Sequence, residues 1–175
     1  MGNWIFIAPI VGVIALIFAF FLSKKVSREE AGTDRMKEIA EAISDGAHAF
    51  LTAEYRILVI FIVVLFVLIA VGIGVGSGIA FVAGTLCSIL AGYFGMSVAT
   101  KANVRTANAA RTSGMNRALS IAFSGGAVMG MSVVGLGLLG VSIVYMVTGD
   151  TNILFGFSLG ASSVALFSRV GGGIY

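Results

Sequence analysis

The stretch WIFIAPIVGVIALIFAFFL, residues 4–22, decides the fold of this protein. It contains no charged side chain, and it is close to the roughly 20 apolar helical residues that cross the hydrocarbon core of a bilayer. No basic segment precedes it, and it ends just before Lys24 and Lys25. The stretch therefore predicts a retained first membrane helix rather than a cleaved signal peptide.

The composition of the whole chain extends this prediction. Hydrophobic residues make up 58% of the 175 residues and charged residues 11%, whereas about 25% of the residues in an average soluble domain are charged. The net charge is +3, but the cations lie beside the apolar segments and only one tryptophan and four tyrosines are present. We interpret the basic residues as topology signals and expect no nucleic-acid partner.

Apolar segments long enough to cross a membrane recur along the chain, so we expect an all-α, polytopic transmembrane helix bundle. The charged segment before the second span has apolar residues at helical spacing, which predicts an amphipathic helix over about 34–55. The glycine-rich GIGVGSG and the short TGDTN are predicted turns. The predicted spans are 4–22, 57–73, 79–98, 118–147 and 153–169, within one membrane-embedded unit that covers 1–175.

The charges predict an orientation. Residues 23–56 and 100–117 lie on the same side of the membrane, because two spans separate them. The second of these charged loops has four cations and no acid. The positive-inside rule makes this side cytoplasmic, so the N-terminus is expected outside.

Arg169, near the end of the last predicted span, is the strongest candidate for a functional residue. An arginine at such a position is costly and tends to mark a pathway, a binding site or a buried ion pair. The alternative is an arginine that extends to the lipid headgroups. Small residues share its helix face and favour an inward-facing charge. They are Ser158, Ala161, Ser162 and Ala165.

Three glycines follow this arginine, Gly171, Gly172 and Gly173. Amide groups without side chains can approach an anion closely, but the run alone is a weak signal. Small residues four apart elsewhere predict close helix packing. They are Ala80, Gly84, Ser88 and Gly92 in the third span, Gly126 with Gly130 in the fourth, and Gly156 with Gly160 in the fifth.

The other polar residues give weaker indications of a functional site. The acidic stripe Asp34, Glu38, Glu41 and Asp45 could hold a divalent cation, but a solvated helix face is the commoner meaning. His48 is the only histidine and Cys87 the only cysteine, so neither completes a catalytic or metal site by itself. The basic segment ATKANVRTANAAR is expected to contact anionic lipid headgroups, with an anionic substrate as the alternative.

Four stretches, in order over almost the whole chain, resemble the membrane-bound pyrophosphatases, which are integral membrane enzymes that pump ions as they hydrolyse pyrophosphate. They are GTDRMKEIAEAISDGAHAFL at 32–51, GMSVATKANVRTANAAR at 95–111, GGAVMGMSVVGLGLLG at 125–140 and ALFSRVGGGIY at 165–175. The amino-acid sequence of each stretch is distinctive, so the resemblance is specific.

The resemblance implies a fold of about sixteen membrane helices, of which this chain supplies the first five. It implies that Arg169 lies between the hydrolytic funnel and the ion gate, paired with acidic groups on neighbouring inner helices. Gly171–Gly173 would then form the turn that leads into the segment binding magnesium pyrophosphate. That aspartate-rich segment does not occur here, so we expect an N-terminal fragment without catalytic or metal-binding residues, inactive in isolation.

The resemblance also implies partners. They are pyrophosphate, Mg²⁺, membrane lipids, a second copy of the complete protein in a homodimer, and Na⁺ or H⁺ as the pumped ion, with a slight preference for sodium and an open question over K⁺. The competing interpretation is a small channel or transporter subunit without enzymatic activity. Natural termination after Tyr175 and ion flux without pyrophosphate would distinguish it.

Overall fold

Five long helices form the structure, a computed structural model in which the backbone of residues 6–174 and the side chains of 6–168 and 170 are described. The helices are α1 (Ile7–Arg28), α2 (Asp34–Gly72), α3 (Val75–Ser113), α4 (Met115–Thr148) and α5 (Thr151–Ile174). All five are long and apolar enough to cross a membrane. The predicted all-α bundle of five apolar helices is therefore confirmed.

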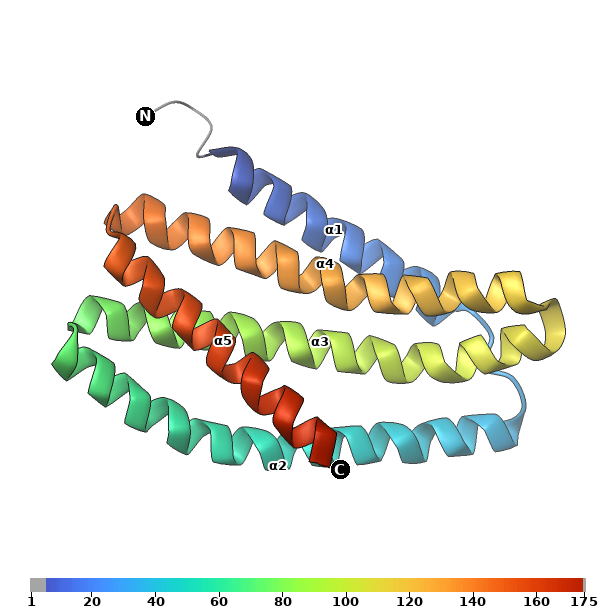
Figure 1. The fold of residues 1–175 in the computed structure, drawn as a ribbon. Helices are drawn as coiled ribbons and strands as arrows, with labels where there is room; N and C mark the ends of the chain where they lie inside the picture. Colours follow the sequence, from blue (N-terminus) through green and yellow to red (C-terminus); the bar gives the residue numbers. More distant parts are fainter. Residues whose placement is uncertain (1–5, 175) are drawn as a thin grey trace.

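Successive helices run in opposite directions (Figure 1). Helix α3 packs against α4, α5 and α2, and α1 packs mainly along α4. Helix α5 crosses α3 obliquely, so that its C-terminal end lies beside the middle of α2 (Figure 1). We call the end of the bundle where α1 and α3 end and α2 and α4 begin the charged end.

Each link between helices contains a glycine with a positive φ angle: Gly32, Gly74, Gly114 and Gly149. At Gly149 the φ angle of 63° closes α4 with a left-handed cap, whose N–H donates to the carbonyl of Tyr145 at 2.8 Å. A residue with a side chain rarely adopts such an angle. Glycine is thus the C-terminal cap of α3, at Gly114, and of α4, at Gly149.

The charged segment 100–117 differs from the predicted loop because it is almost wholly helical. The predicted loop 100–117 consists of Gly114 alone, since α3 continues to Ser113 and α4 begins at Met115. In the charged segment 23–56, α2 begins at Asp34 and contains the predicted helix over about 34–55, so only residues 29–33 lie outside helices. Hydropathy marks where the membrane ends and not where a helix ends, and lysine, arginine and alanine are good helix formers. GIGVGSG likewise reduces to a break at Ile73 and Gly74.

The buried interior consists largely of small side chains, and most of the large apolar side chains lie outside. A cluster of Ala19, Val26, Val98, Ala102 and Val128 joins α1, α3 and α4. By contrast, large side chains such as Val71 (84% exposed) and Phe123 (75%) point away from the bundle. This distribution is typical of a membrane protein, in which lipid covers the apolar exterior.

Candidate functional site

Helix α5 carries the residues that the sequence singles out. Arg169 lies in its last turns, and its side chain lies outside the described residues. Its pairing with acidic groups, and its role at a gate, therefore stay predictions.

Gly171–Gly173 belong to α5, which continues to Ile174. The three glycines are therefore helical here, and the turn predicted at them stays a prediction. A run of glycines permits a turn but does not require one, because the helix still satisfies its backbone hydrogen bonds. Any role of the three glycines in leading to a substrate-binding segment stays a prediction.

The stripe of small residues on α5 does not face the rest of the bundle. Ser158, Ser162 and Ala165 are exposed, and Ala161 is half-buried. The buried face of α5 is a different one, formed by Gly156, Phe157, Gly160 and Val164. Among the described residues, nothing buries the face that carries the serines.

The buried face of α5 packs closely against α3 through three glycines, which we call the glycine interface: Gly84, Gly156 and Gly160. A Cβ atom at Gly160 would collide with the carbonyl oxygen of Phe81, and one at Gly156 with that of Ser77. A Cβ atom at Gly84 would collide with the carbonyl oxygen of Phe157. The two backbones touch, so α5 is positioned by contacts that no larger residue permits.

The other predicted packing residues divide into two groups. Ala80 is buried on α3, as expected. A Cβ atom added at Gly126 or Gly130 would meet no atom of another helix within 4 Å, so these two glycines form no close contact in the described part of the chain. The spacing of small residues does not identify Gly12 and Gly135, whose backbones meet between α1 and α4. In the sequence, each is simply a glycine within an apolar helix. Its role becomes visible only when α1 and α4 are seen to pack against each other.

Hydrogen bonds from α3 organise the charged end. The guanidinium of Arg105 donates to the carbonyl oxygens of Glu29 at 3.0 Å, Lys101 at 2.8 Å and Ser27 at 3.5 Å. Asn108, which is 4% exposed, donates to the carbonyl oxygen of Glu30 at 3.2 Å. The bonds to Ser27, Glu29 and Glu30 satisfy carbonyl groups at and beyond the end of α1, which have no helical partner of their own.

An ion pair closes the same region. The guanidinium of Arg117 on α4 lies 2.6 Å from the carboxylate of Glu29, whose side chain is 20% exposed. We call Arg105, Asn108, Arg117 and Glu29 the arginine cluster. It lines a polar pocket of about 270 Å³ together with Arg28 and Glu30. The predicted basic segment thus binds the chain's own backbone, and contact with lipid headgroups stays a prediction.

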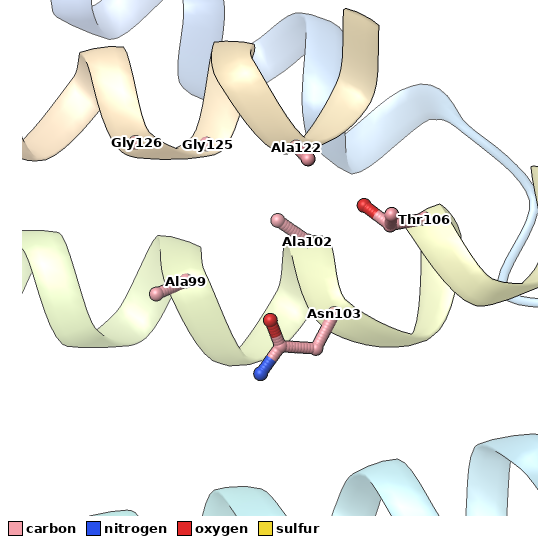
Figure 2. Close-up of a pocket in the computed structure, with 7 residues that line it drawn as sticks. All are labelled: Ala99, Ala102, Asn103, Thr106, Ala122, Gly125 and Gly126. Atoms are coloured by element: carbon pink, nitrogen blue, oxygen red, sulfur yellow. The ribbon is translucent and has the colours of Figure 1, made fainter. Parts of the chain in front are cut away.

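A second pocket, of about 220 Å³, lies between α3 and α4 (Figure 2). Small residues line it, and none of them is charged: Ala99, Ala102, Asn103, Thr106, Ala122, Gly125 and Gly126. The amide of Asn103 turns away from α4 (Figure 2). The pocket offers no charged partner to an anion or cation.

The acidic stripe on α2 is a solvated surface. All four of its residues are exposed. Asp34 pairs with Lys37 at 3.0 Å and Glu38 pairs with Arg35 at 2.7 Å, each pair on the helix surface. No group of three or more histidine, cysteine, aspartate or glutamate side chains suited to a metal occurs in the described part of the chain. The described residues therefore do not fit the ligand set of a magnesium site.

The imidazole of His48 has neighbours that explain its position. Its Nδ1 lies 2.8 Å from the carbonyl oxygen of Ser44, one turn earlier on the same helix. Its ring packs edge-on against Tyr93, with 6.3 Å between the ring centroids. These contacts orient the ring on the surface of α2.

Five long apolar helices, a lipid-facing exterior and close contacts between glycines define a multi-pass helical membrane protein. The family model described as "Inorganic H+ pyrophosphatase" matches residues 13–175, almost the whole chain. The chain belongs to this family, as its four distinctive stretches predict.

Curated relatives agree with this assignment. The chain is 58% identical over its full length to a "Putative K(+)-stimulated pyrophosphate-energized sodium pump" of Clostridium tetani. It is 48% identical, again over its full length, to a "K(+)-insensitive pyrophosphate-energized proton pump" of Methanosarcina mazei. It is 39% identical, over 95% of its length, to a "K(+)-stimulated pyrophosphate-energized sodium pump" of Thermotoga maritima. The chain spans 26% of the length of each of these relatives.

Proposed function

We propose that this chain forms part of a pyrophosphate-energised cation pump, which couples hydrolysis of pyrophosphate to ion transport across a membrane. The match to the family over residues 13–175 carries this proposal. Three features of the structure support it: five apolar helices, an α5 fixed against α3 at backbone contact, and an arginine in the last turns of α5.

In this proposal α5 is the helix next to the transport pathway. One face is held by the glycine interface, while the face with Ser158, Ser162 and Ala165 is not covered by α1–α4. Arg169 would supply a fixed positive charge near a gate, where low dielectric lets it act on a passing cation over several ångström. Acidic groups of other inner helices would be its partners.

Pyrophosphate and Mg²⁺ are proposed to bind outside the described residues, because those residues do not provide a fitting set of carboxylates. When bound, the metal would neutralise charge on the diphosphate. The contribution of this chain is then positional: it places α5 and directs the chain after it. By itself the chain is expected to hydrolyse no pyrophosphate.

The proposed orientation places the charged end in the cytoplasm and the N-terminus outside. The charged end carries Arg28, Arg105, Arg111 and Arg117, and the α4–α5 link contributes Asp150 alone. This asymmetry supports the orientation through the positive-inside rule. A homodimer and contact with lipid headgroups remain part of the proposal.

The ion is proposed to be Na⁺ or H⁺, since relatives named for each ion match at similar coverage. A chimera tests the proposal directly. This chain replaces the matching segment of the Clostridium tetani relative, and pyrophosphate-dependent uptake of Na⁺ and H⁺ is measured in inverted vesicles. Uptake of either ion that requires Mg²⁺ is expected. A correctly inserted chimera without hydrolysis or uptake would contradict the proposal.

A further inference from the structure

Glu54 is a buried carboxylate that the proposed function does not use. Both carboxylate oxygens are inaccessible to solvent, and neither has a hydrogen-bond partner among the described residues. An ionised carboxylate in such a position costs several kcal/mol unless a positive charge or a set of donors compensates it. The described residues provide no such compensating group.

The position of Glu54 on α2 explains its burial. Leu51 lies three residues before it and Leu58 four residues after it, so all three share one helix face. Both leucines are buried, with exposed fractions of 8% and 1%. The carboxylate thus occupies a place on the apolar, packed face of α2, where this helix contacts α3 and α5.

The contact between α2 and α3 beside Glu54 involves neutral oxygen atoms. The hydroxyl of Tyr55, the next residue on α2, donates to the carbonyl oxygen of Ile89 at 3.4 Å. The first basic residue of α3 after Ile89 is Lys101, twelve residues later and about 18 Å along the helix. On α2 itself, the exposed Arg56 lies two residues on, which is the opposite side of the helix.

Helix α5 contacts α2 near the same level. The rings of Phe61 and Phe167 lie 4.5 Å apart between centroids. Glu54 is seven residues before Phe61, about 10 Å toward the N-terminal end of α2, and the C-terminal end of α5 points in that direction (Figure 1). The one charged residue of α5 is Arg169. This arginine is therefore the alternative partner that a test of Glu54 has to distinguish.

We propose that Glu54 is the carboxylate of a binding site for a monovalent cation, Na⁺ or H⁺, at the interface of α2 with α3. One carboxylate balances one positive charge, whereas sites for divalent cations usually combine several acidic groups. The Tyr55 hydroxyl, on the next residue of α2, and the Ile89 carbonyl to which it donates are the neutral oxygens that we propose as further ligands of a sodium ion. The site does not depend on pyrophosphate, so it is testable separately from the proposed pump.

A hydrophobic carbodiimide tests this site in membranes that contain the protein. The reagent adds to a neutral carboxyl group and forms a stable acylurea, which mass spectrometry locates on a peptide. Labelling is compared in choline chloride and in sodium chloride at equal ionic strength. Glu41, exposed on the same helix, is the matched control. We expect about tenfold more labelling at Glu54 than at Glu41 in choline chloride, since the hydrophobic reagent partitions into the apolar face of α2 and not onto its solvated face.

The comparison of labelling in the two salts then identifies the cation. Labelling of Glu54 that sodium chloride suppresses supports a sodium site, and labelling that sodium does not change supports a proton site. Labelling no greater than at Glu41 in both salts overturns the proposal. Labelling that appears only in Arg169→Gln also overturns it, because Glu54 is then the permanent partner of the arginine. Glu54→Gln confirms the labelled position and leaves these outcomes readable in the wild-type protein even if the variant folds poorly.

Discussion

The glycine interface and the arginine cluster hold neighbouring helices together by opposite means. At the glycine interface α3 and α5 meet at backbone contact, without charge and without room for a methyl group. At the arginine cluster, guanidinium and amide groups reach across to carbonyl oxygens beyond the end of α1. Lipid supplies no hydrophobic force between helices, so the apolar part depends on close packing, whereas the charged end uses hydrogen bonds.

A substitution in the glycine interface is expected to have the largest effect on stability. Gly160→Ala places a methyl group against the carbonyl oxygen of Phe81, and the backbone cannot move aside without separating α3 from α5. We expect a loss of about 3 kcal/mol in the free energy of unfolding. Unfolding by sodium dodecyl sulfate in mixed micelles measures it.

Gly130→Ala is the matched control, because no neighbouring atom lies within 4 Å of the added methyl group. It should change stability by less than about 1 kcal/mol, in the stabilising direction. Equal losses in the two variants would show that the close contact of α5 with α3 does not determine stability.

Removal of the Arg105 side chain is expected to have the next largest effect. Arg105→Ala leaves the carbonyl oxygens of Ser27 and Glu29 without their charged donor. Hydrogen bonds from charged groups contribute about 1.5–3 kcal/mol, so we expect a loss of about 2 kcal/mol. Faster hydrogen exchange in residues 29–33 would locate the loss. Arg35→Ala, which removes an exposed pair with Glu38, should change neither quantity appreciably.

Two further glycines are expected to respond with opposite signs. Gly32 has a φ angle of 88°, and an added Cβ would lie 2.8 Å from the Asn108 side-chain oxygen. Gly32→Ala should therefore cost about 1–2 kcal/mol. Gly46 lies inside α2 with open space around it, so Gly46→Ala should stabilise by up to about 1 kcal/mol. Thermal unfolding of both variants gives the signs, and a gain for Gly32→Ala would contradict the structure of this link.

The smallest expected effect concerns the ion pair of Arg117 with Glu29. The arginine side chain is 51% exposed, so water and salt screen the pair. Arg117→Gln should cost at most about 1 kcal/mol, and the cost should fall as salt rises. A salt-independent loss larger than that of Arg105→Ala would make this pair the main support of the charged end.

The sequence predicts the glycine interface better than the arginine cluster. Gly84, Gly156 and Gly160 stand four residues from other small residues, and this spacing is a local signal of close packing. Gly126 and Gly130 have the same spacing without such contacts here, so spacing indicates a capacity to pack and not a partner. The bonds of Arg105 join residues 76 and 78 positions apart, and no local pattern reveals them.

Glu54 shows a signal that the sequence contains but that is easily overlooked. It belongs to a segment with many charges, where one more glutamate suggests a solvated surface. Its spacing from Leu51 and Leu58 places it instead on the apolar face, which the structure buries. A charged residue on the apolar face of an amphipathic helix is thus more informative about function than the number of charged residues in the segment.

The most direct test of the proposed pump compares two chimeras with the Clostridium tetani relative. One carries this chain unchanged and the other carries it with Arg169→Ala. Pyrophosphate-driven uptake of Na⁺ and H⁺ into inverted vesicles is measured beside phosphate release. We predict magnesium-dependent uptake with the unchanged chain, and loss of uptake with altered hydrolysis for Arg169→Ala. Unchanged pumping by the Arg169→Ala chimera would contradict a role of α5 at the gate.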